Sequence, residues 1–221
     1  MKIHREGHKT ILILFLVLLI INILTFYFLF IKWVFYPILI LSAILMAIII
    51  RFFRIPARTR MRGDNLVIAP ADGKIVAKEE VFENEYFNDK RIQLSIFMSP
   101  HVPHINWCPI TGNVKYYNYQ KGAHHAAFHP KSSMENEMST FVIEGEYNEY
   151  EIMCRQIAGA IARRIVTYCK TGDHVEQSRQ IGFIKFGSRV DILLPLDAKV
   201  ILNMDDPVFG SQTILAELPH E

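Results

Sequence analysis

A glycine-serine pair, Gly187-Ser188, lies between two strand-like runs and could carry out chemistry on its own peptide bond. Glycine leaves its carbonyl unhindered and tolerates a strained backbone, which attack of the Ser188 hydroxyl on the preceding carbonyl requires. A second pair, Gly210-Ser211, shows that the dipeptide also arises as an ordinary turn. The pair alone therefore leaves a self-attacking nucleophile and a structural turn both open.

Five histidines fall close together in the chain and could act as acids or bases near pH 7. They are His101, His104, His124, His125 and His129. The last two have the i, i+4 spacing that can hold a metal on a helix, but no third ligand accompanies them, so we expect no metal site. Any one of the five could equally be a solvated or a satisfied core histidine.

An aspartate, Asp72, occupies the turn Pro70-Ala-Asp-Gly73. Its carboxylate could simply accept a hydrogen bond from its own backbone there, or it could be functional. The sequence lacks the glycine-rich nucleotide motifs, the H-E-x-x-H zinc motif, the G-x-S-x-G elbow and the kinase signatures. The odd number of cysteines, three, without a C-x-x-C pair, argues against a disulfide framework and indicates a reducing compartment.

Hydrophobic residues make up 51% of the 221-residue chain, and they are unevenly distributed. Between Thr10 and Ile50 the only charged residue is Lys32. As helices, residues 10–31 and 33–50 would measure about 33 Å and about 27 Å, against roughly 30 Å of bilayer hydrocarbon. We therefore predict a transmembrane hairpin over residues 10–50, with a shallow re-entrant wedge as the alternative. The interfacial turn is predicted at Tyr27, Lys32, Trp33, Tyr36 and Pro37.

Both flanks of this hairpin are basic, which by the positive-inside rule places both ends in the cytoplasm. The flanks are a tail over residues 1–9 and a juxtamembrane segment over residues 51–62, with arginines at Arg51, Arg54, Arg58, Arg60 and Arg62. These arginines are either topology determinants only or lie against anionic lipid headgroups. The apolar stretch is too long for a cleaved signal peptide. We expect a location in the inner membrane with the following domain facing the cytoplasm.

The rest of the chain, residues 63–221, alternates short apolar runs with turn residues, which is typical of β structure. The segment 151–168 is ambiguous, because Ile157, Ile161 and Ile165 share one face at either helical or strand spacing. Residues 199–216 look like the closing hairpin of a biotinyl or lipoyl-like sandwich. The predicted fold is a mostly-β barrel-sandwich hybrid with minor helix, preceded by the hairpin.

Five motifs in order distinguish the chain from other β domains. They are Ala69-Pro-Ala-Asp-Gly73, Ser99-Pro-His-Val-Pro-His-Ile-Asn-Trp-Cys-Pro109, Glu135-Asn-Glu137, Ile157-Ala-Gly159 with Ala162-Arg-Arg-Ile165, and Gly182-Phe-Ile-Lys-Phe-Gly-Ser-Arg-Val-Asp191. In this combination the chain resembles the short, membrane-associated bacterial class of phosphatidylserine decarboxylases, pyruvoyl-dependent enzymes made as proenzymes.

The resemblance implies that Ser188 attacks the Gly187 carbonyl and that the chain cuts itself between them. A β chain, residues 1–187, and an α chain, residues 188–221, would remain together as a heterodimer. Ser188 would become a pyruvoyl group, the only cofactor expected. This group would form a Schiff base with phosphatidylserine and support its decarboxylation to phosphatidylethanolamine and CO2.

The resemblance also implies roles for Asp72, in self-cleavage, and for His104, in decarboxylation. Long-form relatives carry a second histidine where this chain has Trp107, and an indole cannot act as a general base. The cleavage base is therefore open: His104 itself, or one of His101, His124, His125 and His129.

Two other readings stay open. The chain could be a pyruvoyl decarboxylase of a soluble amino acid, although the apolar leader favours a lipid substrate. It could also be a non-catalytic, membrane-anchored sandwich module, in which case the chain would stay intact. We expect no nucleic-acid partner, and a higher oligomer is open.

Overall fold

The computed structural model describes residues 2–29, 32–122, 136–147, 149–159, 164–185 and 187–219. The chain divides into two compact units, Met1–Ala57 and Arg58–Glu221, which are described separately. The division falls inside the arginine-rich segment, so Arg58 and the arginines after it belong to the second unit.

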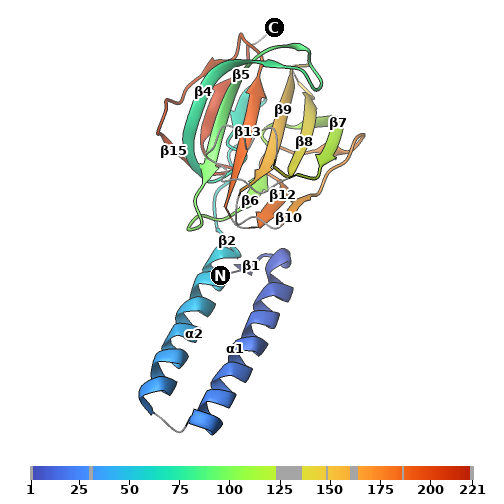
Figure 1. The fold of residues 1–221 in the computed structure, drawn as a ribbon. Helices are drawn as coiled ribbons and strands as arrows, with labels where there is room; N and C mark the ends of the chain where they lie inside the picture. The colour runs from blue at the N-terminus through green and yellow to red at the C-terminus, as the bar shows by residue number, and fades with distance from the viewer. Residues whose placement is uncertain are drawn as a thin grey trace. The chain divides into compact units, whose positions relative to one another are not determined.

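The first unit consists of two long apolar helices, α1 (His8–Leu29) and α2 (Lys32–Phe52), as predicted (Figure 1). A short 3-10 helix, η1 (Arg5–Gly7), precedes them, and β1 (Lys2–Ile3) pairs antiparallel with β2 (Arg54–Ile55). Asn22 donates to the Ser42 hydroxyl across the two helices at 3.0 Å. By length and composition, both helices could cross a membrane.

Pro37 lies inside α2 rather than in the predicted turn between the helices. Because α2 begins at Lys32, Pro37 comes early in the helix and withholds a single backbone hydrogen bond, the one to the Trp33 carbonyl. The apolar residues on both sides of Pro37 continue the helix despite that loss.

The second unit is built from antiparallel strands, which confirms the mostly-β prediction (Figure 1). They are β3 (Leu66–Ile68), β4 (Gly73–Glu83), β5 (Asp89–Met98), β6 (Ile105–Trp107), β7 (Gly112–Gln120), β8 (Met138–Gly145), β9 (Glu151–Ala158), β10 (Arg164–Thr167), β11 (His174–Val175), β12 (Gln180–Lys185), β13 (Ser188–Leu194), β14 (Lys199–Val200), β15 (Pro207–Val208) and β16 (Ile214–Glu217). The main sheet has the order β11-β7-β8-β9-β13-β5-β4-β15. Two three-stranded sheets, β10-β12-β6 and β14-β16-β3, complete the unit.

The ambiguous segment from Glu151 onward forms two strands, β9 and β10, on either side of residues 160–163, which lie outside the described part. Strand β9 pairs with β8 on one side and with β13 on the other. Ile157 therefore lies in a sheet and not on a helical face.

Strand β13 lies in the middle of the main sheet, between β9 and β5, and all of its residues are buried. Val190, Ile192 and Leu194 pack into the main hydrophobic core on one face of the sheet. Leu193 packs into a smaller apolar cluster with Val142 and Met153. Because successive strand residues alternate between faces, β13 is covered on both sides.

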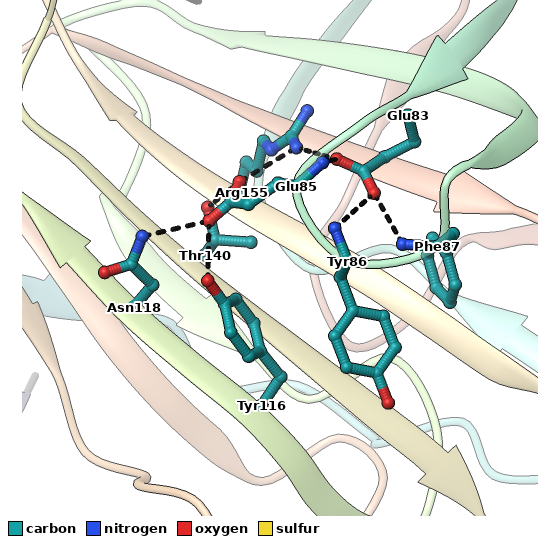
Figure 2. A network of polar contacts seen from close by, with 8 residues as sticks. All are labelled: Glu83, Glu85, Tyr86, Phe87, Tyr116, Asn118, Thr140 and Arg155. Atoms are coloured by element: carbon teal, nitrogen blue, oxygen red, sulfur yellow. Dashed lines mark hydrogen bonds and ion pairs between the residues drawn. The ribbon is translucent and has the colours of Figure 1, made fainter.

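The turn between β4 and β5 folds over that smaller cluster and is held by a polar network (Figure 2). The Glu83 carboxylate accepts hydrogen bonds from the backbone N–H groups of Glu85, Tyr86 and Phe87, at 2.8 to 2.9 Å, and pairs with Arg155. Arg155 also contacts Glu85 at 2.9 Å. Burial acts to raise the pKa of Glu83, but the three N–H groups and Arg155 outweigh it and lower the pKa.

We expect Glu83→Gln to destabilise the folded chain by about 2 kcal/mol at pH 7, because a neutral amide replaces a charged acceptor of several bonds. A lowered folded-state pKa stabilises the fold above the unfolded pKa of about 4.3, and that contribution disappears as pH falls through the folded value. The variant should therefore unfold at a lower temperature than wild type, and this difference in unfolding temperature should be smaller at pH 3 than at pH 7. The control is Glu80→Gln, an exposed glutamate of the same strand. An equal difference in unfolding temperature at both pH values would contradict this explanation.

Candidate active site

The Gly187-Ser188 peptide lies at the entrance to the central strand of the main sheet. Ser188 is the first residue of β13, is completely buried, and pairs with Met98 of β5 and Ala158 of β9. Gly187 has φ +57°, in the left-handed region that favours glycine. A Cβ on Gly187 would meet no atom within 4 Å, so its backbone conformation, and not lack of space, favours glycine.

Both polar groups of Gly187 are held by residues that are distant in sequence. Its carbonyl accepts a hydrogen bond from the Gly159 N–H at 2.9 Å. Its own N–H donates to Nε2 of His104 at 3.1 Å. Gly187 is thus held on both sides, by the segment after β9 and by the segment before β6.

The Ser188 hydroxyl donates to the Met98 sulfur at 3.2 Å. A thioether is a weak acceptor, so this contact holds the hydroxyl only loosely. The second pair differs, because the Gly210 carbonyl accepts from the Arg58 guanidinium at 3.1 Å and φ is positive at Ser211 instead of at the glycine. The two glycine-serine pairs are therefore distinguished by geometry although their sequences match.

His104 is completely buried just before β6, and its hydrogen bonds define its tautomer. Because the Val102 carbonyl can only accept, Nδ1 carries the proton and donates to it at 2.9 Å. Nε2 is therefore unprotonated, and its lone pair accepts from the Gly187 N–H. Burial lowers the pKa of His104 to about 4, although the Val102 carbonyl and Asp72 act to raise it. At pH 7 His104 is a neutral imidazole aimed at the Gly187 peptide.

Asp72 is buried in its turn, and it binds groups far from its own backbone. Its Oδ1 accepts from the Gly210 N–H at 2.8 Å. The two guanidinium nitrogens of Arg58 bind its two oxygens, each at 2.5 Å. From the sequence, Arg58 was assigned to the juxtamembrane segment, residues 51–62. No feature of the sequence distinguishes it from the four other arginines there.

Trp107 packs beside this carboxylate. A Cβ added to Gly210 would lie 2.5 Å from the indole and 3.1 Å from the Asp72 oxygen, so only glycine lets the three groups meet. The Arg60 guanidinium lies over the Trp107 ring, 5.8 Å from its centroid. Position 107 therefore holds an aromatic ring that packs and takes no proton.

A buried polar chain that the sequence did not reveal leads to the same place. Asn106 donates to the Met98 sulfur at 3.8 Å and accepts from Gln156 at 2.7 Å. The Thr167 hydroxyl continues the chain to Gln156 and to Ser139, at 2.7 Å each. Met98 thus contacts both Asn106 and Ser188. No regular spacing links these residues, so a sequence pattern could not have identified them.

The other candidates contribute less. His101 is exposed in the turn after β5, whereas His124, His125 and His129 lie outside the described residues. Within the described ranges, no three histidine, cysteine or acidic side chains could hold a metal together. The cysteines are buried free thiols, and burial, with a smaller effect of Asp173, raises the pKa of Cys169 to about 12.

Comparisons with known proteins show the family of the chain. The sequence profile of the family described as phosphatidylserine decarboxylase matches residues 45–216. A phosphatidylserine decarboxylase proenzyme of Cytophaga hutchinsonii is 46% identical, covering 98% of this chain and 99% of its own. One of Parabacteroides distasonis is 48% identical, covering 99% of both chains. The resemblance inferred from the sequence is confirmed, and the chain belongs to the phosphatidylserine decarboxylase family.

Proposed function

We propose that this chain is a self-cleaving proenzyme that matures between Gly187 and Ser188 and then decarboxylates phosphatidylserine to phosphatidylethanolamine and CO2. The observation that carries the proposal is the Gly187-Ser188 junction: the Gly187 carbonyl accepts from the Gly159 N–H, the Gly187 N–H donates to His104, and Ser188 is completely buried. Family membership supports the substrate.

Scission begins when the Ser188 side chain rotates away from Met98 and its oxygen bonds to the Gly187 carbonyl carbon. His104 exchanges its bond to the Gly187 N–H for the Ser188 hydroxyl and takes its proton on Nε2. The bond from Gly187 carbon to Ser188 nitrogen then breaks, and the nitrogen receives that proton, leaving an ester. Loss of the Ser188 α-proton expels the Gly187 carboxylate and leaves dehydroalanine. One water converts dehydroalanine into pyruvoyl and releases ammonia.

The Gly159 N–H is positioned to stabilise the negative charge that develops on the Gly187 oxygen during attack. Gly159→Pro removes this donor and should slow scission by about 100-fold or more, the usual effect of losing one oxyanion donor. Gly159→Ala keeps the N–H and is the matched control. Chain scission followed by gel electrophoresis tests the pair; equally fast cleavage of Gly159→Pro would remove the role assigned to this donor.

Residue 188 is suited to carry the group that forms there. Its position is buried beside Met98 and Ala158, so a ketone at this place would be shielded from bulk water. The Asn106 amide reaches the same sulfur and offers donor hydrogens beside it. When formed, the pyruvoyl group supplies a ketone that binds the substrate amine and accepts electrons as CO2 leaves.

The two chains should remain together after scission, because the α chain is interleaved with the β chain. Residues 188–221 contribute β13 to β16. Strand β13 pairs with both β5 and β9, β15 pairs with β4, and β16 pairs with β3. Separating the chains would break backbone hydrogen bonds at each of these pairings, so we propose a stable heterodimer.

We further propose that α1 and α2 cross the inner membrane as a hairpin, with the catalytic domain in the cytoplasm. Their length and hydropathy support the crossing, and the basic residues at both flanks support the orientation. An enzyme with a two-chain lipid as substrate benefits from permanent attachment to the bilayer that holds it.

The function is tested with full-length protein in mixed micelles, offered phosphatidylserine or free serine. We expect phosphatidylethanolamine and CO2 from the lipid and negligible turnover of free serine. Preferential turnover of free serine would favour a soluble amino acid as the substrate. A cut chain that decarboxylates neither would contradict the proposed activity.

A further inference from the structure

We propose that Arg58 is a positioning residue of the maturation site, acting through Asp72. The inference rests on the proposed self-cleavage and adds to it a residue that the sequence assigned only to membrane topology or lipid contact. Arg58 is the side chain that fixes the orientation of the Asp72 carboxylate in a chain with tryptophan at position 107.

The contacts of Arg58 are those of a buried structural ion pair and not of a surface charge. Its side chain is 15% exposed, and that of Asp72 is 4% exposed. Two parallel bonds join the guanidinium to the carboxylate, and a third joins it to the Gly210 carbonyl. The Phe209 ring lies 5.7 Å from the guanidinium carbon and covers it.

This arrangement restricts what Asp72 can do. The Gly210 N–H and the two guanidinium nitrogens already engage both oxygens of the carboxylate. A carboxylate bound in this way is a fixed charge with a fixed orientation, and is poorly placed to accept a proton from Ser188. The proton transfer of scission therefore falls to His104, whose electrostatic environment includes Asp72.

The contacts of Arg58 require the guanidinium group of an arginine. A lysine would carry the same charge, but as a point donor it could not bind both carboxylate oxygens and the Gly210 carbonyl in one plane. We therefore expect the order of scission rates wild type, Arg58→Lys, Arg58→Gln, with Arg58→Gln slower than wild type by at least about ten-fold.

A control variant separates positioning from simple loss of stability. Arg155 is also a partly buried arginine with two carboxylate partners, and its side chain is 17% exposed, but it belongs to the network over the β4–β5 turn (Figure 2). Arg155→Gln should lower the unfolding temperature as Arg58→Gln does, yet leave the scission rate unchanged.

The test is a double-mutant cycle on full-length proenzyme, synthesised into liposomes and followed by the rate at which the chain is cut. Asp72→Asn should slow scission, and adding Arg58→Gln should slow it no further, because Arg58 acts only through Asp72. The double variant also removes the unpaired buried charge, so it should fold if Arg58→Gln alone does not.

Three results would overturn the inference. Arg58→Gln could be cut as fast as wild type, it could slow scission by the same factor in the Asp72→Asn background, or Arg155→Gln could slow scission equally. In each case wild type is still cut and the proposed function stands. An uncut wild-type chain would instead overturn the proposed function and this inference together.

Discussion

Ser188→Ala is expected to leave the proenzyme as one uncut chain of 221 residues with no decarboxylase activity. Alanine has no oxygen to attack the Gly187 carbonyl, and it cannot become a pyruvoyl group. The loss should be complete, because the ester, the dehydroalanine and the pyruvoyl group are all formed from the Ser188 side chain.

The second glycine-serine pair provides the matched control. Ser211→Ala removes a hydroxyl from a buried serine of the same dipeptide, at a position where the preceding carbonyl is bound by Arg58. We expect Ser211→Ala to be cut at position 187 as in wild type. Decarboxylation by purified Ser188→Ala would refute the pyruvoyl mechanism outright.

His104→Ala is expected to slow scission by about 100-fold to 10,000-fold, the range in which a general base contributes. The neutral Nε2 of His104 is the basic atom beside the Gly187 peptide, and Trp107 offers no substitute. His101→Ala, which changes an exposed histidine of the same motif, is the control and should be cut normally. Scission of His104→Ala at the wild-type rate would rule out this assignment.

The pH dependence of wild-type scission tests the same role without mutation. Because burial lowers the pKa of His104 to about 4, the imidazole stays a free base through neutral and mildly acidic pH. The rate should be level between pH 6 and 8 and fall toward pH 4, whereas an ordinary histidine would halve it near pH 6.5. A midpoint near pH 6.5 would show that His104 is not the base or is not buried.

The stability of the folded chain should also depend on pH through His104. The unfolded chain binds a proton at His104 below about pH 6.5, and the folded chain does so only below about 4. Stability therefore falls as pH drops through this window, and scission in acid must be compared at equal folded fractions.

Strands and candidate residues differed in how well the sequence predicted them. Apolar alternation correctly predicted β structure after the hairpin, because antiparallel sheets leave a period of two in the chain. The same alternation could not decide between helix and strand at Ile157, because every fourth residue also fits a period of two. Pairing of β9 with β8 and β13 settled it.

The site was predictable only where a side chain type carries chemistry. Ser188 and His104 were candidates from the sequence, and the structure places both at the Gly187 peptide. Gly159 contributes a backbone N–H that any residue but proline has, so composition could not single it out. The sequence did not distinguish Arg58 from the arginines near it, and only the structure shows its ion pair with Asp72.

The most direct test of the account is an intact-mass spectrum of the purified wild-type protein in detergent. We predict two chains, residues 1–187 with an ordinary carboxylate end and residues 188–221 with a pyruvoyl group in place of the Ser188 amine. A single mass for the uncut chain of 221 residues would contradict maturation at Gly187-Ser188 and leave the non-catalytic membrane-anchored domain as the better explanation.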